Sequence, residues 1–212
     1  MSKKEAPLHA LSQYLPEGVL DDVLQYLHQY RIHLTISRER TTLLGDYRNA
    51  TTGKNHRISV NGNLNPFAFL ITLLHEIAHL ITFEAYGHKA APHGKEWKQE
   101  YGKLLAAFLL RKVFPPDIEK ALLRSIANPS ATTCGETNLM RVLKRYDAKK
   151  DGWLMVEELK VGALFRMRDG TVFRRGEKLR KRIRCTKLQS GQEYLFSAVY
   201  EVEVLDGPPV SS

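Results

Sequence analysis

Cysteine is scarce in this sequence: two residues, Cys134 and Cys185, occur among 212. A small secreted protein held together by disulfides would carry more, so the count argues against that class and favours a reducing environment. Two cysteines so far apart cannot supply the four thiolates of a structural zinc ribbon. One long-range bridge between them is left open by the sequence.

Long uninterrupted apolar runs are also missing. The longest, around residues 67–74, contains Thr72 and is closed by His75 and Glu76, so it falls short of the ~18 apolar residues of a membrane span. The first residues, MSKKEAPLHALSQYLPEG, have no apolar segment after their lysines, which a secretory signal requires. We therefore expect no membrane association and a cytoplasmic location, with the nucleoid as a further option.

Negative charge is in deficit, because 32 Lys and Arg stand against 23 Asp and Glu for a formal net charge of +9. The basic excess is densest in RRGEKLRKRIRCTK, residues 174–187. A polyanion such as DNA suits this stretch, and a solvated β-surface is the alternative. The candidate nucleic-acid contacts are Arg174, Arg175, Lys178, Arg180, Lys181, Arg182 and Arg184.

The order of helical and strand patterns predicts an α+β protein. Residues 16–30 have apolar side chains at helical spacing, with Pro16 near the start, and three short alternating runs follow between residues 31 and 62. We expect these runs to form a small antiparallel sheet in which Ile58 and Val60 share one face.

Two long helices are predicted next. The first is opened by Asn65 and Pro66 and is ended by Gly87. The second covers about residues 94–114, has Trp97 on its apolar face and is stopped by a pair of prolines. With a shorter third helix, these elements complete a first domain.

The C-terminal part has a different character. After a short helical segment it is rich in strand patterns, with turn signals at Gly170 and Gly191. We expect a small antiparallel sheet or partial barrel. The predicted domains are therefore 1–130 and a basic, β-rich 131–212.

Four of the eight histidines lie in LHEIAHLITFEAYGHKAAPHGKEW, residues 74–97. His75 and His79 are four apart on a predicted helix, so they project from one face, one turn apart. That geometry suits two imidazole nitrogens on one zinc at about 2.0–2.1 Å. Glu76 emerges about a quarter-turn away, where it can reach a metal-bound water as general base. Unpaired ionisable groups in so apolar a segment would be costly, which also favours a metal.

A catalytic zinc needs a third protein ligand and one open position. We expect His93 to be that ligand, because it lies at the start of the next helix and can pack across the first. His88, Glu96 and Glu100 are the alternatives. Candidates for binding the substrate carbonyl or its oxyanion are His88, Tyr86 and Tyr101.

The same segment resembles the SprT-like zinc metallopeptidase family, which includes the protease domain of Spartan. The family pattern is H-E-x-x-H, a short loop, then a histidine followed by glycine and an aromatic residue. The resemblance implies zinc ligation by His75, His79 and His93, a general-base role for Glu76 and a zincin-like fold. It extends over about residues 15–128, since LLGDYR and ISVNGNL are similar to the family's upstream sheet.

The leading functional prediction is peptide-bond hydrolysis by a zinc-activated water, with Glu76 moving the protons. The substrates would be proteins or peptides, DNA-associated proteins among them. If the run 56–62 is the sheet edge, an extended substrate can pair with it. The alternatives are a DNA-associated accessory protein with a structural or vestigial zinc, and a helical core without zinc.

Overall fold

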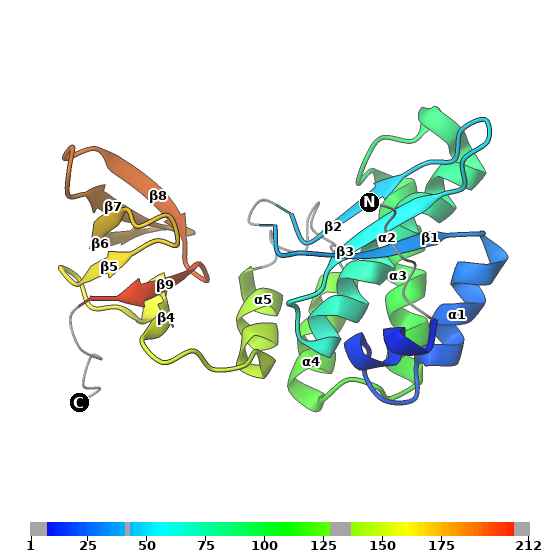
Figure 1. The fold of residues 1–212 in the computed structure, drawn as a ribbon, viewed down its shortest axis with the longest axis horizontal. Coiled ribbons are helices and arrows are strands. Elements are labelled where there is room, and N and C mark those ends of the chain that lie inside the picture. The colour runs from blue at the N-terminus through cyan, green and yellow to red at the C-terminus, as the bar shows by residue number, and fades with distance from the viewer. Residues whose placement is uncertain (1–7, 41–42, 128–136, 206–212) are drawn as a thin grey trace. The chain divides into compact units, whose positions relative to one another are not determined.

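The structure is a computed structural model that describes residues 8–40, 43–127 and 137–205. Helices and strands both occur, so the predicted α+β class is confirmed. The chain divides into two compact units, Met1–Asp147 and Ala148–Ser212 (Figure 1). The elements of the first unit are η1 Leu8–Tyr14, α1 Leu20–Gln29, β1 His33–Ser37, β2 Gly45–Arg48, β3 Arg57–Asn61, α2 Pro66–Tyr86, η2 Gly87–Lys89, α3 Lys95–Leu110, α4 Pro116–Ala127, α5 Thr137–Leu143 and η4 Lys144–Tyr146.

The three strands of the first unit form one mixed sheet in the order β1-β3-β2. β2 is antiparallel to β3, but β1 is parallel to it, so the prediction of a purely antiparallel sheet is wrong. The reason is connectivity: β2 and β3 form a hairpin, and β1 pairs with the remaining side of β3 in the same chain direction. Ile58 and Val60 are both buried, as the alternation predicted.

The position of β3 overturns a second expectation. Because β3 has a partner on each side, residues 56–62 do not form the edge of the sheet. The two edge strands are β1 and β2, and β2 also contacts α2. Among the described strands, β2 is therefore the edge strand that lies against the histidine helix.

α2 is capped as the sequence predicted. The Asn65 side chain accepts a hydrogen bond from the Ala68 N–H at 3.0 Å, and Pro66 occupies the first turn, where its missing N–H costs nothing. Gly87 ends the helix with a φ of +57°, in the left-handed region that glycine tolerates best.

α2 is more apolar than the broken runs suggested. The segment Pro66–Lys89 is, by length and composition, long and apolar enough to cross a membrane, contrary to expectation, and an 18-residue window in it has a mean hydropathy of 1.5. However, 72% of that window is buried inside the structure. A helix that is apolar on nearly all sides is typical of a protein core, so packing in this unit accounts for its composition.

α3 is shorter than predicted. It ends at Leu110, and Lys112 has a φ of +58°, which helical backbone cannot have. Pro116 then begins α4. Trp97 and Tyr101 are buried on the face of α3 toward α2, and Figure 1 shows both helices behind the three strands.

The residues just before the boundary pack on the first unit. Asn65 Nδ2 donates to the Leu143 carbonyl at 2.9 Å and to Asp147 Oδ1 at 2.6 Å. The units therefore divide after Asp147, later than the expected 130/131. These hydrogen bonds join residues about eighty positions apart, so no local pattern reveals them.

The second unit is a six-stranded antiparallel sheet in the order β4-β9-β5-β6-β7-β8. Gly170 and Gly191 have positive φ in its turns, as the turn signals predicted. Cys185 is a free thiol buried in its core, and Cys134, its partner in the bridge that the sequence left open, lies outside the described residues. The elements are β4 Trp153–Met155, η5 Val156–Glu158, β5 Leu164–Arg166, β6 Val172–Leu179, β7 Arg182–Lys187, β8 Glu193–Ser197 and β9 Glu201–Val204.

Candidate metal centre

Three histidines converge in the first unit. His75 and His79 project from α2, and His93 lies in the turn before α3. The Nε2 atom of His93 is 3.2 Å from Nε2 of His75 and 2.9 Å from Nε2 of His79. Nitrogens bound tetrahedrally to one zinc at its usual distance lie roughly 3.3 Å apart. The donor set and its spacing therefore fit one zinc ion.

The turn before α3 directs His93 toward α2. His93 has a φ of +59°, a left-handed conformation that is uncommon outside glycine. The next residue, Gly94, donates its N–H to the Ala91 carbonyl at 2.9 Å, and a Cβ at Gly94 would meet that oxygen at 2.9 Å. Such backbone strain costs about 1–3 kcal/mol and is concentrated at functional sites.

All three imidazoles have lowered pKa values. Burial, and then the neighbouring imidazoles, lower the pKa of His75 to about 3 and that of His79 to about 4 from the usual 6.5. Burial also lowers the pKa of His93. The rings are therefore neutral at neutral pH, which is the form that binds a metal.

An aromatic wall holds the histidine rings in place. Trp97 is fully buried, and its ring centroid lies 4.7, 5.2 and 4.7 Å from those of His75, His79 and His93. Tyr101 stacks on Trp97 at 4.9 Å. His75 Nδ1 has no hydrogen-bond partner among the described residues, so packing rather than a hydrogen bond orients that ring.

Glu76 lies beside the cluster and is 7% exposed. Burial, and then the charge of Asp46, raise its pKa to about 8, while Arg40 acts in the opposite direction. The backbone of β2 passes directly over this carboxyl, since a Cβ on Gly45 would lie 2.6 Å from Glu76 Oε1. The carboxyl is thus enclosed between α2 and the edge strand.

The other sequence candidates lie outside the cluster. His88 is exposed and packs on Phe83 with ring centroids 5.2 Å apart, and Tyr86 is also exposed. Glu100 pairs with Lys103 at 2.7 Å. Among the described residues the metal-capable group contains His75, His79 and His93, without His88, Glu96 or Glu100. Tyr101 is buried against Trp97, which gives it a packing role.

Two residues of the site, Gly45 and Tyr47, were not predicted from the sequence. Tyr47 on β2 lies parallel to the His79 ring, at 2° and 6.5 Å between centroids, and Gly45 allows the strand to approach Glu76. A signal was available in LLGDYR, because a glycine inside a strand often marks close approach of another group. Only the position of β2 over α2 shows which group approaches.

The chain belongs to the SprT-like family, whose profile matches residues 13–118, or 106 of 212 residues. It is 32% identical over 93 residues to Protein SprT of Photorhabdus laumondii subsp. laumondii, covering 40% of this chain and 47% of that protein. It is 57% identical over 35 residues to Protein SprT of Vibrio parahaemolyticus serotype O3:K6, covering 16% and 21%. The chain thus spans about half or less of these curated relatives. No solved structure matches it.

Proposed function

We propose that this protein is a zinc-dependent metallopeptidase with a zincin-like first unit. The main support is the convergence of His75, His79 and His93 next to the buried carboxyl of Glu76. Nε2 of His93 lies 3.2 Å from that of His75 and 2.9 Å from that of His79. A zinc ion held there would polarise the scissile carbonyl and acidify a bound water. These features support a hydrolytic site of the H-E-x-x-H type.

The residues of the site would have separate roles in the reaction. His75, His79 and His93 would hold the ion as neutral ligands. Glu76 would act as general base and then pass its proton to the leaving amine. Trp97, fully buried behind the rings, excludes water from that side.

β2 is the element we propose for substrate binding. It is one of the two edge strands of the sheet, so among the described residues no strand pairs with its outer side, where an extended peptide can be added. Gly45 lies over Glu76 and Tyr47 lies against His79. A peptide added to this edge would therefore run past the metal centre, which favours protein or peptide substrates in extended conformation.

Zinc removal tests this proposal. We expect purified protein to hold one zinc per chain and to cleave labelled unfolded casein. Chelation should abolish cleavage, because the ion supplies the activated water, and added zinc should restore it. Metal analysis and a fluorescence assay on the same samples provide the measurement. An undiminished rate in zinc-free protein would contradict the proposal.

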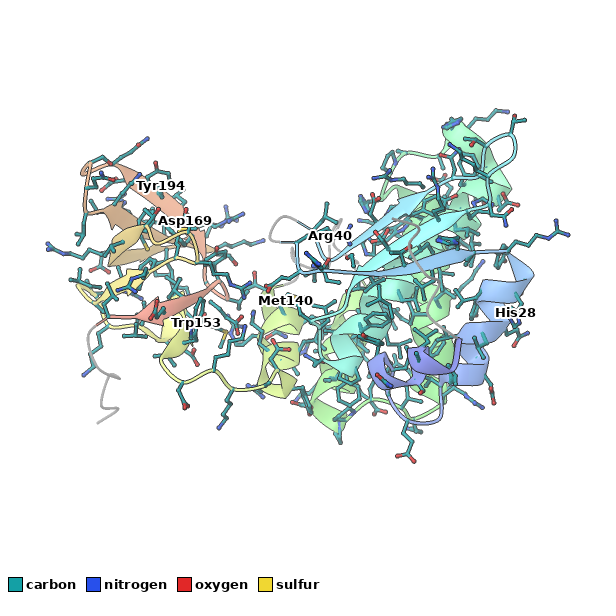
Figure 2. All side chains as sticks on the ribbon, in the orientation of Figure 1. His28, Arg40, Met140, Trp153, Asp169 and Tyr194 are labelled. Carbon is teal, nitrogen blue, oxygen red and sulfur yellow. The ribbon has the colours of Figure 1, made fainter. Side chains whose placement is uncertain are left out.

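A second function, nucleic-acid binding by the second unit, is proposed from a hollow of about 430 Å³ on its sheet. Arg182 and Lys187 line it together with aromatic rings. Phe173 and Phe196 are buried in the core, but Tyr194, labelled in Figure 2, is 39% exposed. An exposed ring beside cations is typical of single-strand binding by base stacking and phosphate contacts.

The remaining basic candidates differ in their surroundings. Arg184 pairs with Glu193 at 3.5 Å, and Arg175 is half-buried and donates to the Gly176 carbonyl. The exposed candidates are Arg174, Lys178, Arg180, Lys181, Arg182 and Arg184. This second proposal is compatible with a peptidase and is also the basis of the alternative, an accessory protein with a vestigial zinc.

Tyr194→Ala is expected to weaken binding of a single-stranded oligonucleotide by about 5–100-fold, the loss of one stacked base. Arg182→Glu should weaken binding and flatten its salt dependence. Lys120→Glu, an exposed lysine on α4, is the control for overall charge. Fluorescence anisotropy at several salt concentrations measures these effects. Equal losses for Lys120→Glu and Arg182→Glu would rule out a localised site.

A further inference from the structure

A buried histidine outside the metal cluster joins β2 to α2. His56, immediately before β3, is 7% exposed. Its Nδ1 accepts hydrogen bonds from the Ala50 N–H at 3.2 Å and the Tyr47 hydroxyl at 3.0 Å. A backbone N–H can only donate, so the ring proton lies on Nε2. That nitrogen is 3.1 Å from Glu84 Oε1, on the last turns of α2, and donates to it.

Tyr47 carries this connection to a metal-binding ring. Its ring is nearly parallel to that of His56, at 19° and 5.9 Å, and to that of His79, at 2° and 6.5 Å. Phe83 packs against both Tyr47 and His56, at 6.5 and 6.3 Å. A continuous series of contacts therefore leads from Glu84 through His56 and Tyr47 to His79.

The same contacts set the position of the edge strand. Gly45 and Tyr47 are two residues apart, so both face α2. At Gly45 a Cβ would lie 2.6 Å from Glu76 Oε1 and 2.8 Å from Thr72 Cγ2, so the strand has no room to move inward there. At Tyr47 the hydrogen bond to His56, which in turn donates to Glu84 on α2, opposes outward movement of the strand.

We propose that His56 and Glu84 are positioning residues for the metal centre. They fasten Tyr47 against the His79 ring and hold β2 in register beside Glu76. Two consequences follow: loss of the pair should loosen zinc binding, and it should displace the strand that an extended peptide would join. The second consequence rests on the proposed peptidase function, whereas the first requires only that the protein binds zinc.

The test compares variants that remove or keep the hydrogen bond. Glu84→Ala removes the acceptor of the His56 Nε2–H, Glu84→Gln keeps an acceptor, and His56→Leu removes both sets of hydrogen bonds. Asp22→Ala is the matched control, since it breaks a partly exposed ion pair with Arg111, at 2.8 Å, on α1. The readouts are zinc affinity by chelator competition, the visible spectrum of the cobalt-substituted protein, and KM and kcat on a casein-derived peptide.

We expect Glu84→Ala and His56→Leu to lower zinc affinity about tenfold, the lower end of what outer partners of metal ligands contribute. Both should shift the cobalt spectrum and raise KM more than they lower kcat. Glu84→Gln should restore most of the affinity, and Asp22→Ala should leave all three readouts unchanged.

The opposite results are equally clear. If Glu84→Ala and His56→Leu lower thermal stability as Asp22→Ala does, but keep wild-type zinc affinity, cobalt spectrum and KM, the positioning role is overturned. If His56→Leu does not fold, the comparison of Glu84→Ala with Glu84→Gln shows whether the hydrogen bond from His56 affects zinc binding. If the wild-type protein binds zinc but cleaves nothing, only the peptidase proposal is refuted. Zinc affinity and the cobalt spectrum would then still test the positioning role of His56 and Glu84.

Discussion

Glu76→Gln should retain zinc and lose peptidase activity by a factor of about 10²–10⁴, the usual contribution of a general base. Glutamine has nearly the shape of glutamate, so the contacts with β2 are preserved, but an amide cannot take a proton from water. His75, His79 and His93 are unchanged in this variant, so the metal should stay bound. Zinc analysis and the rate of casein cleavage on the same sample measure both parts.

The pH dependence of protein stability gives a second test of Glu76→Gln, independent of activity. In the metal-free protein, burial raises the pKa of Glu76 to about 8 from the usual 4.5. A carboxyl whose pKa is higher in the folded than in the unfolded protein stabilises the fold. This stabilisation is complete at pH values below the unfolded-state pKa, and it is lost as the pH rises to the folded-state pKa. Between pH 5 and 8 the wild type should therefore lose about 1 kcal/mol per pH unit relative to Glu76→Gln, measured by urea unfolding. A Gln variant that cleaves as fast as wild type would refute the assigned role of Glu76.

His93→Ala should reduce zinc affinity by more than about 100-fold, because even the outer partners of ligands contribute 10–100-fold. The two ligands on α2 would remain, but the third nitrogen, 2.9 Å from His79 Nε2, would be gone. Peptidase activity should fall with zinc occupancy. Chelator competition gives the affinity, and circular dichroism of the metal-free variant shows whether its fold is intact.

His88→Ala is the matched control for this prediction. His88 lies in the same connection between α2 and α3, but it is exposed and packs on Phe83 outside the cluster. We expect its zinc affinity to equal that of wild type. The reverse outcome, with zinc lost in His88→Ala and kept in His93→Ala, would mean that the turn before α3 does not supply the third ligand.

The metal-site candidates on α2 could be predicted because they depend on local geometry. A spacing of four residues places His75 and His79 on one face of any α-helix, wherever that helix lies in the protein. The limits of α2 were equally local, since the Asn65 cap and the positive φ of Gly87 act on neighbouring backbone groups. His93 required more than spacing: it was preferred to His88 for its place at the start of the next helix, and the resemblance to the family implies the same ligand.

The predictions that failed depended on contacts between distant segments. The parallel pairing of β1 with β3 and the edge position of β2 follow from which strands meet, and alternation of side chains is the same in either arrangement.

The sequence by itself determined the capped apolar helix and the two imidazoles with their carboxylate on it, since a helix repeats every 3.6 residues whatever surrounds it. Only the tertiary structure decided that His93 meets those imidazoles, that Gly45 lies over Glu76, and that His56 and Glu84 fasten Tyr47 to His79. These contacts join separate elements. Their geometry comes from packing around one core, which no short stretch of sequence contains.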